Sequence, residues 1–320
     1  MGIPVPVFVV GSGRSGTTIM AALLNLLPRV FIAKETGFIG TFHRELVLNE
    51  DSENFAGLIP QINSWLEVSG WQQRGTAVGL RAFCSQHGLS GAQGLVNYIW
   101  QLESKSPWNE LSCIGDNTPL YVMAIPALLQ MFPNAKFIHM VRDPRDLVAS
   151  VLKMRFGAKE ATTAAMEWHH QLGCWLLAER QIPAERRIEC RYEDLCRTPE
   201  ATFERIAAFL GASAEDAREA LRKHAAGDLK ATGFEQVAQQ GHHRRLGEPL
   251  SPARIGRYRR DLSAKQIRDI ESVAQYGLRA YGYEFDEWLI SPLMAENRLL
   301  LLRAAIFDFL NRALQRLRGK

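Results

Sequence analysis

Several features that would define other classes of protein are missing from this sequence. Five cysteines are spread widely over 320 residues without a C-x-x-C pair, which argues against a disulfide framework and for reduced thiols in the core. The N-terminus lacks a basic segment, and the apolar run 5–10 is too short for a signal peptide. No segment reaches the roughly 18 uncharged apolar residues of a membrane span. We therefore expect a cytoplasmic protein.

The charge balance excludes further classes. Lysine and arginine number 38 and aspartate and glutamate 34, so the formal net charge of +4 is compatible with an anionic ligand but not with a broad nucleic-acid surface. The histidines do not indicate a metal site, because the adjacent pairs His169-His170 and His242-His243 point to different faces of a helix or strand. We expect neither nucleic acid nor metal to be bound.

What the sequence does contain is an alternation of short apolar runs with helical patterns. This order is typical of a three-layer α/β fold, in which helices cover a central, mostly parallel sheet of about five strands. Two of the helices carry start signals, a cap before proline at Thr198-Pro199 and an acidic first turn after Ser213. The predicted strands are 5–10, 30–33, 112–115, 136–141 and 187–191. The predicted helices are 16–26, 119–131, 144–154, 159–181, 199–210 and 214–224.

We expect one domain at 1–290 and a separate segment at 295–320. The stretch 37–111 is far too long for a plain connection between the second and third strands, and it predicts a helical insertion over the sheet that recognises the substrate. The segment 295–320 predicts an amphipathic helix with a net charge of +4. Docking on the protein's own core or on a second subunit is one interpretation of this helix, and peripheral binding to an anionic membrane is the other.

Polar and charged residues follow the predicted strands. Because parallel strands present their carboxyl ends at one edge of a sheet, and ligands bind at that edge, these residues predict a single ligand site. The segments concerned are Gly11-Ser12-Gly13-Arg14, Lys34-Glu35-Thr36, Asp116-Asn117-Thr118, Arg142-Asp143 and Tyr192-Glu193-Asp194.

The first of these segments continues as a glycine-rich loop that opens a helix. Its glycines permit a tight turn and leave backbone N–H groups free to surround an anion at the positive end of the helix. The spacing matches G-x-x-x-x-G-K-[ST], but Thr17 stands at the lysine position, which disfavours a kinase or an ATPase. The cation is instead Arg14, whose planar guanidinium can bridge two oxyanions, while Thr17 and Thr18 can donate hydrogen bonds.

The segment 9–18 resembles the 5′-phosphosulfate loop of sulfotransferases that use 3′-phosphoadenosine 5′-phosphosulfate (PAPS). It is most similar to the R-S-G-T-T form of many bacterial members and of tyrosylprotein sulfotransferases. The resemblance implies a P-loop-like fold, PAPS as co-substrate and 3′-phosphoadenosine 5′-phosphate (PAP) as product. It also implies that the 5′-phosphosulfate is held by Arg14, Ser15, Gly16, Thr17 and Thr18.

A second phosphate site is predicted at 136–150, where Arg142 ends a strand and Ser150 lies almost two turns into a helix. An arginine and a hydroxyl so placed can clamp a phosphate, although Arg142 could instead pair with a surface carboxylate. R-D-P-R with a serine eight residues after the first arginine resembles the family's 3′-phosphate motif. Tyr192 in Y-E-D-L resembles a residue near the nucleotide, and Arg257 resembles a late basic residue over the 3′-phosphate. A plain strand-to-helix turn and a solvated basic loop are their alternatives.

The chemistry of sulfuryl transfer requires a positioned acceptor, a base for its hydroxyl and stabilisation of charge on the leaving phosphate. Glu35 is the candidate base, because it follows the strand expected beside the loop. The spacing from Arg14 to Glu35 matches the arginine-to-catalytic-glutamate spacing of tyrosylprotein sulfotransferases; pairing of Glu35 with Lys34 is the alternative. The family often reads G-D-K-T-P where this chain has Asn117 in place of the lysine, so Arg14 or Lys34 would have to compensate.

The sequence therefore predicts a PAPS-dependent sulfotransferase. A P-loop nucleotide kinase and a non-catalytic protein that binds PAP or PAPS are the alternatives, the latter because of Asn117. The acceptor stays open among small molecules, carbohydrates, lipids and peptide tyrosine.

Overall fold

The computed structural model describes residues 2–48, 55, 57–68, 71, 73–155, 157–228, 232–235, 237 and 246–284. These residues divide into two units. The first unit comprises the described parts of Met1–Arg142 and Cys174–Pro252, and the second those of Asp143–Gly173 and Ala253–Lys320.

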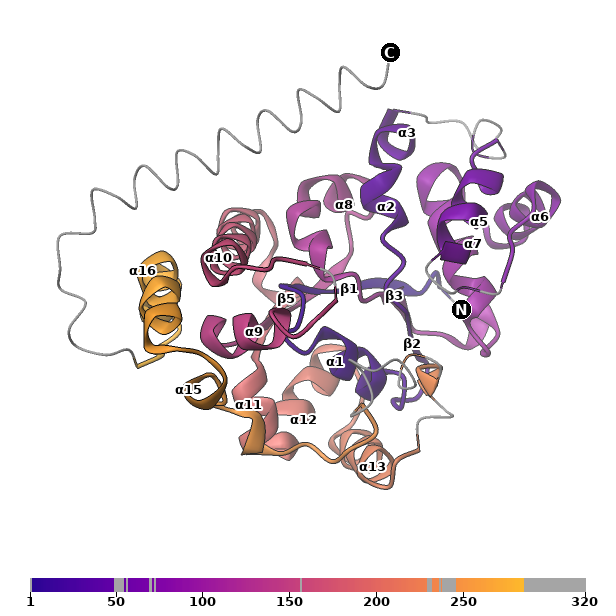
Figure 1. Cartoon of the computed structure of the whole chain (residues 1–320). Helices are drawn as coiled ribbons and strands as arrows, with labels where there is room; N and C mark the ends of the chain where they lie inside the picture. The colour runs from indigo at the N-terminus through magenta and orange to yellow at the C-terminus, as the bar shows by residue number, and fades with distance from the viewer. Residues whose placement is uncertain are drawn as a thin grey trace, which may run out of the picture. The chain divides into compact units, whose positions relative to one another are not determined.

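A five-stranded sheet forms the centre of the first unit (Figure 1). All neighbouring strands are parallel, in the order β2-β3-β1-β4-β5. The strands are β1 (Val5–Gly11), β2 (Val30–Ala33), β3 (Cys113–Asp116), β4 (Lys136–Val141) and β5 (Arg187–Arg191). The five predicted strands and the α/β fold class are thus confirmed; β1 runs one residue further, and β3 begins and ends one residue later.

The central strands β1 and β4 are buried on both faces, which explains why they are mostly apolar, whereas the edge strand β5 is partly buried and carries charged residues. Successive side chains of a strand point to opposite faces, so Phe8 and Val10 of β1 join one apolar cluster and Val7 and Val9 join the other. Helices cover each cluster.

The cluster around Val7 is covered by helices that follow β1 and β5. Met20, Leu195, Phe203 and Ala217 supply one buried side chain from each helix. The helices are α1 (Thr17–Leu24), α11 (Tyr192–Arg197), α12 (Pro199–Phe209) and α13 (Ala214–Ala225).

The cluster around Phe8 is covered by the chain between β2 and β4, and this includes the predicted helical insertion. Its aromatic core has Trp100 edge-on to Phe8, with ring centroids 5.6 Å apart. The elements are α2 (Phe38–Thr41), α3 (His43–Leu48), α5 (Ile59–Val68), α6 (Ala77–His87), α7 (Gly91–Glu103), α8 (Ile125–Met131), and the 3-10 helices η1 (Trp108–Glu110) and η2 (Pro119–Met123).

The helix predicted at 119–131 is split into η2 and α8, because Pro126 lacks the N–H of an i→i−4 bond and disfavours helical geometry just before it. The helix after Thr198 begins at Pro199 as predicted, with Thr198 at its N-cap position. The Thr198 hydroxyl makes no cap bond to this helix and instead donates to the Asp194 carbonyl at 3.1 Å, at the end of α11.

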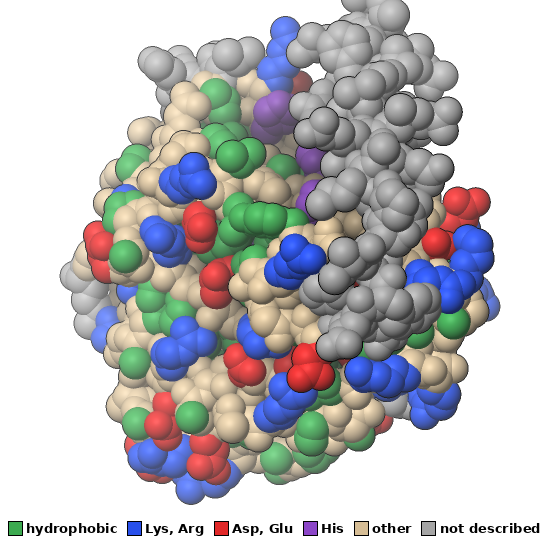
Figure 2. All heavy atoms as spheres, turned by 90° about the vertical axis from the view of Figure 1, so that its left-hand side faces the viewer, with side chains coloured by type: hydrophobic (Ala, Val, Ile, Leu, Met, Phe, Trp, Pro, Cys, Tyr) green, Lys and Arg blue, Asp and Glu red, His purple; other side chains and the backbone are tan. Residues whose placement is uncertain are grey.

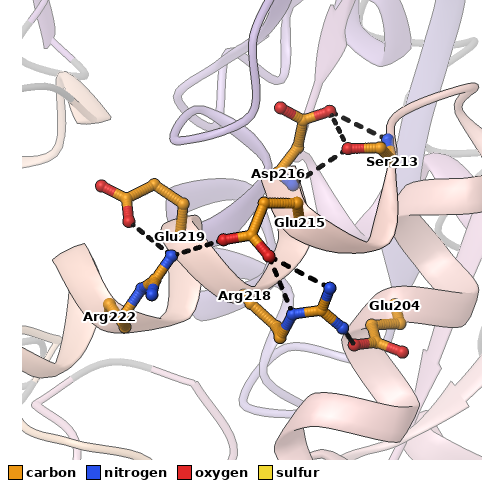
Figure 3. A network of polar contacts seen from close by, with 7 residues as sticks. All are labelled: Glu204, Ser213, Glu215, Asp216, Arg218, Glu219 and Arg222. Atoms are coloured by element: carbon orange, nitrogen blue, oxygen red, sulfur yellow. Dashed lines mark hydrogen bonds and ion pairs between the residues drawn. The ribbon is translucent and has the colours of Figure 1, made fainter.

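The helix α13 carries the second predicted start signal, and here the prediction is confirmed (Figure 3). The Ser213 hydroxyl accepts from the Asp216 N–H at 3.1 Å, and the Asp216 carboxylate accepts from the Ser213 N–H at 2.9 Å. Beyond this capping box, Arg218 links Glu204 of α12 to Glu215 of α13. These ion pairs are solvent-exposed, so each contributes at most about 1 kcal/mol.

The second unit is organised around α9 (Pro144–Val151) by buried polar contacts. Asp143 caps this helix, and its carboxylate also pairs with Arg145, which reaches Glu271 at 2.6 Å on its other side. Asp146 accepts from the backbone N–H groups of Gly256 and Tyr258 at 2.7 and 2.9 Å. Its other helices are α15 (Tyr258–Asp261) and α16 (Ala264–Ala280), while α10 (Ala161–Ala178) begins in this unit and ends in the first.

Short 3-10 helices η3 (Glu179–Gln181), η4 (Ala184–Arg186) and η6 (Pro252–Arg254) complete the described elements; the helix predicted at 159–181 is therefore α10 followed by η3. Lysine and arginine side chains are interspersed with aspartate and glutamate on the face shown in Figure 2. None of the described helices has the length and apolarity needed to cross a membrane. The predicted helix at 295–320 lies outside the described residues.

Candidate active site

The carboxyl ends of β1, β2, β3 and β4 meet at one edge of the sheet. The register places Asp116 of β3 opposite Ala33 of β2, so Glu35 and Asn117 follow from neighbouring strands. In the same way Gly11 of β1 pairs with Met140 of β4, which brings the glycine-rich loop beside Arg142. The prediction that Glu35 follows the strand beside the loop is wrong, because β3 pairs with both β1 and β2 and therefore lies between them. The polar residues predicted to gather at this edge do so.

The glycine-rich loop has three residues with positive φ. At Gly11 (φ 147°) a Cβ would lie 2.3 Å from the Met140 carbonyl oxygen, and at Gly16 (φ 102°) one would lie 2.7 Å from Cδ2 of Tyr192. A side chain is therefore excluded at both positions. The third residue is Arg14, whose φ of 73° is uncommon for a residue other than glycine, and backbone strain of this kind is found at functional sites.

The inner surface of the loop offers polar groups to a ligand. Ser15 is fully buried, and its Oγ has no hydrogen-bond partner among the described residues. Thr17 and Thr18 begin α1, whose first turn has N–H groups that no helical carbonyl accepts. A buried hydroxyl without a hydrogen-bond partner destabilises the fold unless a ligand supplies the missing bond. These residues therefore fit an anionic ligand.

Arg142 contacts this loop directly. Its Nη1 donates to the Arg14 carbonyl at 3.2 Å, and its guanidinium lies 4.3 Å from the centre of the Tyr192 ring, which also contacts Gly16. The structure thus brings four predicted site residues together: Arg14, Gly16, Arg142 and Tyr192.

Two other predicted site residues, Ser150 and Arg257, belong to the second unit. Ser150 is near the end of α9, and Asp146 of the same helix holds the turn that carries Arg257. Arg257 bonds Asp261 through Nη2 at 3.1 Å, while its buried Nε has no hydrogen-bond partner among the described residues. Sequence reasoning missed Asp146, because an acidic residue in a first helical turn is ordinary until its distant partners are known.

Glu35 borders a cavity, and this position explains the shift in the pKa of its carboxyl group. The side chain is exposed to water, yet the surrounding walls remove enough solvent to raise its pKa above 4.5, while the charge of Arg14 lowers it. Lys34 does not pair with Glu35; its Nζ lies 2.9 Å from a carboxylate oxygen of Glu103 on α7. The alternative of a Lys34–Glu35 pair is therefore wrong.

Behind Glu35 lies a set of buried hydrogen bonds that we call the floor, formed by Thr36, Asp116, Thr118 and Tyr121. The Thr36 hydroxyl donates to Asp116 at 2.5 Å, so the Tyr121 hydroxyl, 3.0 Å from it, donates to Thr36 and accepts from the Ile39 N–H. The Thr118 N–H donates to Asp116 at 2.7 Å. Burial raises the pKa of Asp116 to about 7, against the lowering effect of these donors.

The floor was not predicted from the sequence, although Asp116 and Thr36 stood next to predicted site residues. Thr118 Oγ1 accepts from the N–H groups of Thr36 and Gly37, at 3.1 and 3.0 Å. These bonds join the chain after β2 to the chain after β3, so they hold the backbone that directly follows Glu35. Only a partner distant in the sequence reveals this role.

Asn117, which stands at the family's lysine position, is almost fully buried beside the cavity. Its N–H donates to the Ala33 carbonyl at 3.3 Å, and its side-chain oxygen has no partner among the described residues. Since Lys34 is paired with Glu103, Arg14 is left as the cation that can compensate for the missing lysine.

The cavity beside Glu35 has a volume of about 850 Å³. Thr18, Glu35 and Asn117 border it on the side of the glycine-rich loop. Trp65 of α5 and Leu120 and Met123 of η2 also line it, and we call these three the apolar wall. A cavity of this size suits a small-molecule ligand.

Comparison with known proteins decides the family. Residues 6–216 match the model of the sulfotransferase family, which is well over half of the chain. The chain belongs to the sulfotransferase family. Membership of this family guides the functional interpretation of the loop, Arg142 and Glu35.

Individual relatives are distant. A protein-tyrosine sulfotransferase of Drosophila melanogaster is 24% identical over 87% of this chain, and the chain spans 51% of that protein, about half its length. An omega-hydroxy-beta-dihydromenaquinone-9 sulfotransferase of Mycobacterium tuberculosis is 27% identical over 73% of the chain and 71% of its own length. The sulfotransferase domain of the Synechococcus PCC 7002 olefin synthase shares the fold, with a TM-score of 0.56 and 22% identity over 89% of this chain and 98% of that domain.

Proposed function

We propose that this chain transfers a sulfuryl group from PAPS to an acceptor hydroxyl by in-line displacement, with Glu35 as general base. One observation carries the proposal. Arg142 donates to the backbone carbonyl of Arg14 in a glycine-rich loop that lacks the nucleotide kinase lysine, and Glu35 follows the strand next but one to that loop at the mouth of a cavity.

The residues divide the chemical work as follows. Glu35 takes the proton of the acceptor hydroxyl. The acceptor oxygen forms a bond to the sulfur while the bond from the sulfur to the phosphate oxygen breaks. Negative charge then collects on the leaving phosphate. Arg14, Ser15 and the first turn of α1, with Thr17 and Thr18, supply positive charge and hydrogen-bond donors for it.

For the 3′-phosphate we retain the residues that the sequence motif assigns: Arg142, Ser150 and Arg257. The stacking of Arg142 on Tyr192 supports this assignment, because it holds a guanidinium beside the loop. So does the buried Arg257 Nε, which has no hydrogen-bond partner in the described part of the chain and suits an anion.

The names of the relatives give two classes of acceptor, a protein tyrosine for the fly protein and a menaquinone lipid for the mycobacterial one. For this chain we propose a small-molecule or lipid acceptor, bound in the cavity that Trp65 and residues 37–43 of the helical insertion help to line. We place the reaction in the cytoplasm, with 295–320 as the segment for membrane contact or for a homodimer.

The test compares the thermal stabilisation of the chain by PAP and by ATP, with and without magnesium. PAP at 100 times its dissociation constant is expected to add about 2.7 kcal/mol without metal. Arg14→Ala and Arg142→Ala should each reduce the shift, whereas Arg74→Ala, at an exposed pair with Glu67, should not.

Two outcomes would contradict the proposal. Stronger stabilisation by ATP with magnesium would indicate a kinase. Stabilisation by PAP without transfer to any acceptor in a broad panel would indicate the non-catalytic nucleotide-binding protein that Asn117 brings into consideration.

A further inference from the structure

The cavity beside Glu35 gathers apolar side chains that a protein without a ligand for them would bury. Eight large hydrophobic side chains of the described residues are exposed, and the three of the apolar wall, Trp65, Leu120 and Met123, are among them at 40%, 45% and 45%. Ala124, Pro126, Ala127, Phe234 and Val237 continue the lining. Exposed apolar surface gathered in a hollow marks a site for an apolar ligand.

The charges of the cavity do not match an acidic ligand. Among the described residues that line it, the basic side chains are Lys34 and His43. Lys34 is held by Glu103 at 2.9 Å, and the His43 ring nitrogen Nδ1 lies 3.1 Å from the Gly40 carbonyl oxygen. Glu35 itself repels an anion. An acidic peptide would therefore find no available positive charge on the described lining.

The hydroxyl groups of the lining do not match a carbohydrate. The Thr36 hydroxyl is bonded to Asp116 and Tyr121, and the Tyr121 hydroxyl also accepts from the Ile39 N–H. Thr118 accepts from two backbone N–H groups, and Thr41 donates to the Gly37 carbonyl. A sugar has several hydroxyl groups that lose their hydrogen bonds to water on binding, and each unpaired one costs about 1–3 kcal/mol. Among the other polar groups of the lining, Thr18 is assigned to the phosphosulfate, while Glu35 and the Asn117 side-chain oxygen, which has no hydrogen-bond partner among the described residues, border the cavity where the reacting hydroxyl must be.

We infer that the acceptor is an uncharged, largely apolar alcohol, whose single hydroxyl reaches Glu35 while its hydrocarbon part lies along Trp65, Leu120 and Met123. This inference rests on the proposed sulfuryl transfer and names its substrate class. Leu120 and Met123 are then specificity-determining residues, because they contact the acceptor without taking part in the proton transfer.

The experiment measures transfer from PAPS to primary alcohols from 1-hexanol to 1-decanol, to a glutamate-flanked tyrosine peptide and to the disaccharide chitobiose. The alcohols should be turned over, with kcat/KM rising about three-fold for each added methylene until the cavity is filled. A higher kcat/KM for the peptide or the disaccharide, or no transfer to any alcohol despite stabilisation by PAP, would overturn the inference.

A pair of matched variants ties the preference to this cavity. Leu120→Gln should raise KM for 1-decanol about five-fold and weaken the dependence on chain length, with kcat retained. Leu177→Gln, at a leucine that is 69% exposed outside the cavity lining, should change neither. Equal effects of the two variants would contradict the inference. If PAP does not stabilise the wild-type chain, the proposed function itself is contradicted.

Discussion

The floor and the apolar wall of the cavity differ in how they are built. In the floor, Thr36, Asp116 and Tyr121 are at most 1% exposed, and their polar groups are bonded to one another or to backbone. In the apolar wall, Leu120 and Met123 are each 45% exposed and have no polar partner to satisfy. A hydrogen bond from Trp65 Nε1 to the Thr36 carbonyl, at 2.9 Å, links the two regions.

This difference shows how positioning and recognition can be separated within one site. Buried hydrogen bonds have a defined direction, so the floor sets where the β2 end and Glu35 lie. Apolar contact is non-directional and follows the area removed from water, so the wall can select an acceptor by its hydrocarbon surface without setting its orientation. Substitutions in the floor should therefore change stability and kcat, and those in the wall should change KM.

The largest effect is expected at Glu35, which the floor positions. Glu35→Gln should lower kcat by about 10²–10⁴-fold, because an amide cannot accept the proton of the acceptor hydroxyl. Stabilisation by PAP should be retained, which a thermal shift assay measures beside the transfer assay.

The exposed Glu45 provides the control, and Glu45→Gln should leave kcat unchanged. In the wild type, kcat should rise with pH through a pKa above 4.5, since desolvation raises the pKa of Glu35 and the base must be ionised. Full activity of Glu35→Gln would remove Glu35 from the mechanism.

The next effect concerns the pH dependence of stability. Because the pKa of Asp116 is about 7 in the folded state against 3.8 unfolded, its stabilising contribution is fully present below pH 3.8 and is lost as the pH rises through about 7. Between pH 5 and 7.5 the free energy of unfolding should fall by roughly 3 kcal/mol from this residue. Urea unfolding of the wild type and of Asp116→Asn at both pH values measures the difference.

Asp116→Asn should lose this part of the pH dependence of the free energy of unfolding, whereas Asp228→Asn, at an exposed aspartate, should keep it. The same slope in the wild type and in Asp116→Asn would show that Asp116 is ionised throughout this range in the folded protein.

A smaller loss is expected from Thr36→Val, which keeps the shape of the side chain and removes the hydroxyl between Asp116 and Tyr121. The free energy of unfolding should fall by about 2 kcal/mol, and kcat should fall with it, because the end of β2 is less well held. Ser64→Ala removes an exposed hydroxyl that donates to the Pro60 carbonyl and lies outside the cavity lining, so it should change neither quantity appreciably. Urea unfolding and steady-state kinetics compare the two.

The smallest effect on stability belongs to the apolar wall. Met123→Ala should change the free energy of unfolding by less than about 0.5 kcal/mol, since the side chain is half exposed. KM for an apolar alcohol should nevertheless rise several-fold. A stability loss as large as that of Thr36→Val would show that floor and wall are not separate in function.

Much of this architecture follows from local sequence. The strands are short and are bounded by turn or polar residues, and β2, β4 and β5 are found at their predicted limits. The glycine-rich loop is also a local feature, because Gly11 and Gly16 are required by close backbone and ring contacts. The split of the helix at 119–131 is local as well, and Pro126 was the available signal.

The sequence by itself determined the order of the strands along the chain, the loop with Arg14, and the position of Glu35 after the second strand. Only the tertiary structure decided that Lys34 pairs with Glu103, that Thr36 and Asp116 share a buried hydrogen bond, and that Asp146 holds the turn of Arg257. The physical reason is that hydrogen bonds and ion pairs join residues 69 to 110 positions apart in these cases, and such pairings depend on packing that no local pattern encodes.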